Sequence, residues 1–129
     1  MPRAKELKVR VDNRPGVLGE VASALGAKKV NLRAAHAWAE GDVGFIRVVP
    51  EQATAGRKAL TAAGYSVDER EVAEVVLADK PGALGEVAAK LGRAGIDIEY
   101  MYVGSAGAAR KVSAFFGVGD VGAALKAAR

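Results

Sequence analysis

The chain of 129 residues contains no cysteine, one histidine and only seven aromatic residues, namely one tryptophan, three tyrosines and three phenylalanines. Without cysteine it can form no disulfide, no thiolate metal site and no cysteine nucleophile. No stretch approaches the ~20 apolar residues of a membrane-spanning helix, and residues 1–6 lack the apolar core of a secretory signal. We therefore expect a cytoplasmic protein without a membrane partner.

The sequence also lacks the patterns that carry catalysis. It has no cluster of His, Asp and Glu at metal-ligand spacing, no phosphate-binding loop, and no Gly-x-Gly-x-x-Gly between a strand and a helix. His36 and Trp38 share one side of a predicted strand, which favours a packed or surface aromatic pair over a catalytic role. Glu20 and Glu86 lie away from the apolar helix stripe and are expected to face solvent. We expect no catalytic residue, metal site or cofactor.

A net charge of +4 and a pI near 9.5 raise the question of nucleic-acid binding. The basic residues are scattered pairs, however, interleaved with acidic residues and without aromatic platforms or long basic runs. We expect a solvated surface and no nucleic-acid partner. The pairs are Lys8 with Arg10, Lys28 with Lys29, Arg57 with Lys58, and Arg110 with Lys111.

An internal repeat organises the chain. Shifting the sequence by 66 positions aligns residues 15–26 with residues 81–92, and nine of the twelve aligned residues are identical. The match continues with residues 30–32 against residues 96–98. One repeat that covers half of the chain indicates two copies of one domain, whereas a solenoid needs at least ~3 units. We expect domains at residues 1–70 and 71–129.

The first copy changes its hydrophobic period along the chain. Apolar residues alternate with polar ones over residues 7–12, which predicts a strand, and then follow a helical stripe after Pro15. Further expected elements are a strand at 30–38, a turn at 40–42, a strand at 45–49, a helix at 51–63 ended by Gly64, and a short strand at 65–67. This is the split βαβ, ferredoxin-like order.

The second copy predicts the same order with one element missing. We expect a strand at 72–78, a helix at 81–93, strands at 96–104 and 110–118, and a helix that begins at Asp120. The closing strand is apparently absent, so this sheet either has three strands or is completed by another segment. The predicted fold is α+β, with two βαββαβ repeats, antiparallel sheets and helices on one face.

A short motif that occurs twice resembles the ACT domain. Its copies are Asn13-Arg14-Pro15-Gly16-Val17-Leu18 and Asp79-Lys80-Pro81-Gly82-Ala83-Leu84, followed by the matching segments 30–32 and 96–98. The resemblance covers nearly the whole chain and implies a regulatory module of amino-acid metabolism whose domains pair side by side. It also implies a ligand between the motif loop of one domain and the second strand of a neighbour. The residues that match the family's ligand contacts are Asn13, Gly16, Val17, Leu18 and Asn31 in the first copy, and Asp79, Gly82, Ala83, Leu84 and Asp97 in the second.

The loop chemistry agrees with a zwitterionic ligand. Unpaired N–H groups at the positive end of a helix can hold a carboxylate, and Asn13 or Asp79 can accept hydrogen bonds from an ammonium group. A purely structural interpretation also remains open. In it the Pro-Gly pairs only start a helix, and Asn31 and Asp97 only shape a turn. Some family members that bind serine carry a histidine two residues before the Asn, where this chain has Val11 and Leu77, so the resemblance does not support serine as the ligand. The first copy has asparagine at the two polar positions and the second copy has aspartate, so the two sites differ in charge.

These observations predict a non-catalytic regulatory protein that senses a free amino acid at the boundary between two ACT domains and forms a homo-oligomer. Two alternatives stay open. The chain could be a ligand-free module for oligomerisation or partner docking, or a regulatory small subunit of an amino-acid biosynthetic enzyme.

Overall fold

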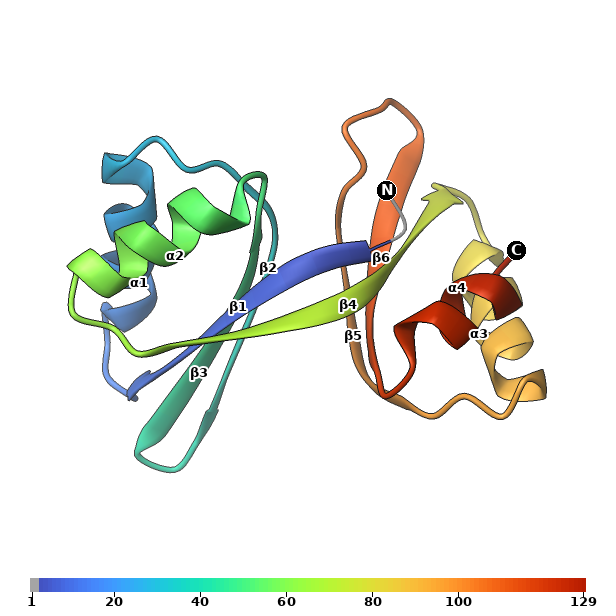
Figure 1. The fold of residues 1–129 in the computed structure, drawn as a ribbon, viewed down its shortest axis with the longest axis horizontal. Helices are drawn as coiled ribbons and strands as arrows, with labels where there is room; N and C mark the ends of the chain where they lie inside the picture. Colours follow the sequence, from blue (N-terminus) through green and yellow to red (C-terminus); the bar gives the residue numbers. More distant parts are fainter. Residues whose placement is uncertain (1–2) are drawn as a thin grey trace. The chain divides into compact units, whose positions relative to one another are not determined.

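The computed structural model describes residues 3–129, whose helices and strands are shown in Figure 1. No helix in this part of the chain is long and apolar enough to cross a lipid bilayer. The elements, in chain order, are β1 (Arg3–Asp12), α1 (Val17–Ala27), β2 (Leu32–Glu40), β3 (Val43–Pro50), α2 (Ala53–Ala62), β4 (Val67–Ala78), α3 (Ala83–Arg93), β5 (Ile98–Ser105), β6 (Lys111–Val118) and α4 (Val121–Ala127).

The structure divides into two compact units. The N-terminal unit is Lys5–Arg70, and the C-terminal unit combines Glu71–Arg129 with the described residues Arg3 and Ala4. Strands β1 and β4 therefore each contribute residues to both units. The two units repeat one ferredoxin-like plan, an antiparallel sheet with two helices.

The sheet of the N-terminal unit has β3 at its centre, between β2 and β1. Both pairings are antiparallel, and Ile46 of β3 lies opposite Val9 on one side and Ala37 on the other. The first residues of β4 lie beyond β1, where Glu69 forms ion pairs with Lys5 (3.6 Å) and Arg57 (3.5 Å). Strand β2 is the opposite edge.

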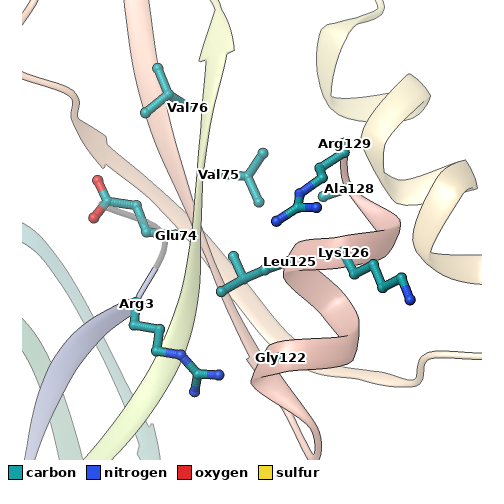
Figure 2. A pocket seen from close by; sticks show the side chains of 9 residues that line it. All are labelled: Arg3, Glu74, Val75, Val76, Gly122, Leu125, Lys126, Ala128 and Arg129. Carbon is teal, nitrogen blue, oxygen red and sulfur yellow. The ribbon is translucent and has the colours of Figure 1, made fainter.

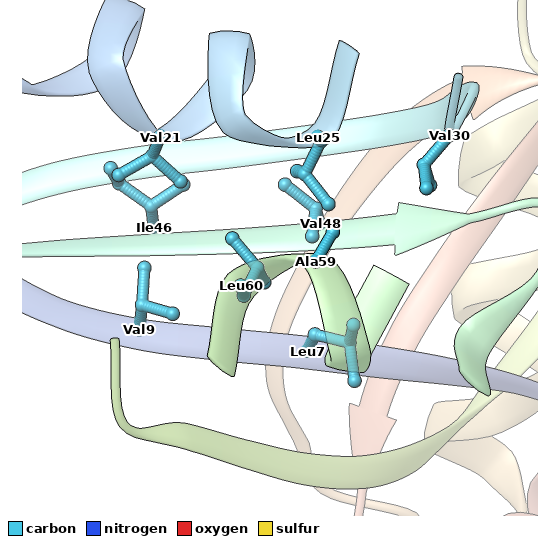
Figure 3. Close-up of a cluster of buried hydrophobic side chains, with 9 residues drawn as sticks. All are labelled: Leu7, Val9, Val21, Leu25, Val30, Ile46, Val48, Ala59 and Leu60. Atoms are coloured by element: carbon cyan, nitrogen blue, oxygen red, sulfur yellow. The ribbon is translucent and has the colours of Figure 1, made fainter. Parts of the chain in front are cut away.

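Helices α1 and α2 cover one face of this sheet because both carry an apolar stripe toward it (Figure 3). Leu25 of α1 and Leu60 of α2 are at most 1% exposed. Burying each such side chain contributes roughly 1.5–3 kcal/mol. The buried cluster is formed by Leu7, Val9, Val21, Leu25, Val30, Ile46, Val48, Ala59 and Leu60.

The C-terminal unit has the same plan, with β6 between β4 and β5 and with α3 and α4 on one face. The sequence left open what lies at the edge of this sheet. In the structure β1 is the neighbour of β4, and Arg3 forms an ion pair with Glu71 at 2.8 Å. The start of β1 therefore occupies part of the position of a closing strand. The core is formed by Ala73, Leu77, Val87, Leu91, Ala114, Phe116, Val118 and Ala124.

The predicted element order is confirmed, and most boundaries differ by one to three residues. The N-cap role of Asp120 is also confirmed, because its carboxylate accepts a hydrogen bond from the Ala123 N–H at 2.9 Å. The predicted separation of the strands at 65–67 and 72–78 is wrong, since β4 is one continuous strand. Its charged middle has low strand propensity, and Glu69 and Glu71 are accommodated by the ion pairs given above.

Candidate functional site

The motif loop has the same backbone geometry in both copies. Gly16 and Gly82 immediately precede α1 and α3, with φ values of 90° and 87°. This left-handed conformation favours glycine, and it places the start of each helix two residues later than the Pro-Gly pattern predicts. Neither helix has a side-chain hydrogen bond at its N-cap. The Val17 N–H donates to the Arg14 carbonyl at 3.3 Å and the Ala83 N–H to the Lys80 carbonyl at 3.4 Å, so the N–H groups left for a ligand at the positive end of each helix are those of the next two residues.

A pocket of about 560 Å³ opens beside the first of these loops. One wall is the loop and the first turns of α1, and the other is formed by the last residues of β2 and the first residues of β3. Small side chains such as Ala37, Ala39 and Gly44 leave the space open between helix and sheet. The complete lining is Val11, Asn13, Arg14, Gly16, Val17, Leu18, Gly19, Ala22, Ala37, Trp38, Ala39, Gly44, Phe45 and Ile46.

The turn between β2 and β3 fixes Asn13 at the mouth of this pocket. Its backbone N–H donates to the Asp42 carbonyl at 2.9 Å, and its side-chain Nδ2 donates to the Gly41 carbonyl at 3.0 Å. One N–H of Nδ2 is used in this way, and Asn13 can still offer its amide oxygen as an acceptor and its second N–H as a donor to a ligand. An amide oxygen accepts hydrogen bonds and suits an ammonium group.

Arg14 lines the same pocket, but its charge is already balanced by Glu20 in the first turn of α1. Its guanidinium forms two hydrogen bonds with the Glu20 carboxylate, one of them 3.0 Å from Nη2 to Oε1. These hydrogen bonds and the opposite charges lower the pKa of Glu20 and raise the pKa of Arg14. The remaining local attraction for a carboxylate comes from the helix N–H groups.

Trp38 and Phe45 are pocket residues that the sequence reasoning did not assign to the site. Their rings stack with centroids 5.0 Å apart, and Trp38 also stacks on His36 at 4.9 Å, as the shared side of the predicted strand implied. The Arg47 guanidinium lies 4.4 Å from the Trp38 ring centroid. The alternating alanines of β2 were an available sequence signal, because small residues on an edge strand leave space beneath a helix.

The structure does not bring Asn31 into this pocket. Asn31 precedes β2, whereas the pocket uses the other end of that strand, about 20 Å away at ~3.3 Å per residue. Its side chain donates to Glu51 at 3.0 Å, and its carbonyl accepts from the Glu51 N–H at 2.9 Å. These contacts agree with a role in shaping the chain before β2.

The predicted site residues of the second copy have the same backbone arrangement as those of the first copy. They do not line the pocket of about 560 Å³ in the N-terminal unit or the pocket of about 680 Å³ in the C-terminal unit (Figure 2). The Asp79 N–H donates to the Arg110 carbonyl at 2.8 Å, which mirrors the contact between Asn13 and Asp42. Asp97 is exposed before β5. Leu84 is 42% exposed and its counterpart Leu18 is 50% exposed, so both copies present an uncovered leucine at the motif. Gly82 and Ala83 form the helix start.

Residues 3–129 contain no group of three or more His, Asp or Glu side chains placed to hold a metal ion. The lining of the pocket offers hydrogen bonding at one rim and apolar contact along its walls. Such a combination orients a small molecule that carries both charged groups and carbon surface.

Comparisons with known proteins agree with this description. The family model described as the ACT domain matches residues 5–63 and 72–129. No curated protein matches the sequence. Among solved structures, protein BT0572 from Bacteroides thetaiotaomicron superposes with a TM-score of 0.85 and 26% identity, over 97% of this chain and 85% of that one.

Regulatory subunits of aspartate kinase share the fold at lower identity. The ligand-free subunit from Thermus thermophilus gives a TM-score of 0.69 at 17% identity and covers 98% of this chain and 90% of its own. The subunit from Thermus flavus gives a TM-score of 0.64 at 17% identity and covers 99% of this chain and 91% of its own. The two family matches together span most of the sequence, and the chain therefore belongs to the ACT domain family.

Proposed function

We propose that this protein is a non-catalytic regulator that binds a free amino acid with an apolar side chain in the pocket of the N-terminal unit. The observation that carries the proposal is the convergence of the motif loop, the open start of α1 and an apolar cavity of about 560 Å³. This volume is within the usual range for small-molecule sites. Membership of the ACT family supports a regulatory role.

Each part of the ligand has a matching group in this pocket. The carboxylate meets the N–H groups of the first turn of α1, and the ammonium group meets the amide oxygen of Asn13. The side chain packs among Val17, Ala37 and Ile46, which offer no polar side-chain group. An apolar side chain is preferred there because burying a polar group without a hydrogen bond costs free energy.

A regulatory effect requires that the ligand prefer one conformation over another. We propose that binding orders the motif loop against the turn between β2 and β3, since Asn13 already joins these two segments. The regulated target is proposed to be an enzyme of amino-acid biosynthesis, reached through a homo-oligomer.

The test is a thermal-shift screen of the purified chain against the twenty amino acids. A ligand at one hundred times its Kd adds about 2.7 kcal/mol of stability, which raises the Tm of a chain of this size by about 10 °C. We expect a rise with apolar amino acids that is lost in Asn13→Ala and in Ala37→Leu, which fills the pocket. Ala35→Leu is the matched control, because Ala35 is an exposed residue on the same strand outside the pocket lining.

A second candidate function follows from Leu18 and Leu84, which are 50% and 42% exposed at equivalent positions. Exposed apolar residues at matching sites favour a module that docks on another protein without a ligand. In that case no amino acid raises the Tm, and replacing both leucines with serine leaves the isolated chain stable while removing its association with the partner.

A further inference from the structure

Of the described residues that line the pocket of the N-terminal unit, Arg14 alone carries a charged side chain. It lies in the motif loop, two residues before Gly16, where the chain turns into α1. A guanidinium can hold a carboxylate with two parallel hydrogen bonds. A free amino acid carries such a carboxylate, so Arg14 has the chemistry to bind this part of the proposed ligand.

In the structure the guanidinium of Arg14 is already bound to a carboxylate of the chain itself. Its Nη2 donates to Oε1 of Glu20 at 3.0 Å, and its Nη1 donates to Oε2 of the same carboxylate. Glu20 lies in the first turn of α1 and does not belong to the lining of the pocket. Because both terminal nitrogens are used, Arg14 cannot hold a second carboxylate through the same pair of atoms.

The exposure of this ion pair allows Arg14 to exchange one carboxylate for another. The side chains of Arg14 and Glu20 are 53% and 50% exposed. Water screens an exposed pair, so breaking it costs little, whereas breaking a buried pair leaves an unsolvated charge. After an exchange the carboxylate of Glu20 is solvated. The N–H groups of Leu18 and Gly19, in the same helical turn, add to the attraction for a ligand carboxylate.

The second copy of the motif provides a comparison within the same chain. Lys80 takes the position of Arg14, and Glu86 takes that of Glu20. An ammonium group lacks the planar fork of a guanidinium and does not form the same two parallel hydrogen bonds with one carboxylate. Glu86 is exposed in the first turn of α3 and does not line the pocket. Replacing Glu86 therefore removes the same charge from an equivalent helix position and leaves the pair of Arg14 and Glu20 intact.

We infer that Glu20 is an internal competitor that sets the affinity of this pocket, and that the carboxylate of a bound amino acid replaces it on Arg14. The inference rests on the proposed function of the pocket. In the free protein Arg14 is joined to α1, and in the bound protein it is joined to the ligand while Glu20 faces water. Binding therefore changes the charge at the exposed start of α1, and a partner that contacts this helix binds the two states with different affinities.

The experiment measures Kd by isothermal titration calorimetry with the full chain. The ligands are L-valine, L-leucine and L-phenylalanine, which span the sizes of apolar side chains, and the amide of each, in which a neutral group replaces the carboxylate. The protein variants are Glu20→Gln, Arg14→Ala, the double variant with both changes, and Glu86→Gln as the matched control. The amides test whether Glu20 competes with the carboxylate of the ligand, and the double variant tests whether it does so through Arg14.

We expect Glu20→Gln to lower the Kd of the amino acids about fivefold and to leave the Kd of the amides within about twofold, while Glu86→Gln changes neither. In the Arg14→Ala background the Glu20→Gln change should alter the Kd by less than about twofold. An unchanged Kd in Glu20→Gln, an equal gain for the amides, or a full gain without Arg14 would overturn the inference and leave the pocket as a binding site. If none of the three amino acids binds any of these proteins at millimolar concentration, the proposed function is wrong as well.

Discussion

Replacing Gly16 with alanine isolates the conformational requirement of the motif loop. Gly16 has a φ of 90°, and a Cβ built there meets no atom within 4 Å. The substitution therefore creates no steric clash with other residues, and its cost is that of holding an L-residue in a left-handed conformation, about 1–2 kcal/mol. For a chain of this size, that corresponds to a Tm about 4–8 °C lower.

The matched control is Gly26→Ala. Gly26 lies within α1, and a Cβ there also meets no atom within 4 Å, but its φ is not in the left-handed region. Alanine in a helix is favoured over glycine, so this variant should be more stable than wild type by about 0.5–1 kcal/mol. Urea unfolding followed by circular dichroism measures the free energy of unfolding of both variants. A Gly16→Ala variant as stable as wild type would refute the argument.

Two further substitutions test other contacts. Because the pKa of Glu20 is lowered from its ordinary value of 4.5, its contact with Arg14 stabilises the fold above that pH, and the contribution is lost as the pH falls through the folded-state pKa. The stability difference between wild type and Glu20→Gln in urea unfolding should then shrink as the pH falls below 4.5, and a difference that grows on acidification would contradict this. A Cβ at Gly117 would overlap the Tyr100 ring, so Gly117→Ala should cost about 1–3 kcal/mol, whereas Gly119→Ala, with open space around it, should change stability by less than about 0.5 kcal/mol. Equal effects at the two glycines would show that the ring moves aside freely.

The candidate site could be predicted only in part from the sequence. The repeated Pro-Gly loop identified Asn13, Gly16 and the start of α1, because these features depend on residues close together in the chain. Ala37 and Trp38 of the pocket wall were not identified. They reach the loop only through the pairing of β2 with β3, which places distant residues side by side.

The sequence by itself determined the duplication, the order of the elements and the helix-covered faces, since each follows from a local period of apolar residues. Only the tertiary structure decided that β4 is continuous and that β1 contributes to both units. It also places the side-chain amide of Asn31 in a hydrogen bond with Glu51. These outcomes depend on which segments pair across the sheet, and a residue's local neighbours carry little information about pairing partners tens of positions away.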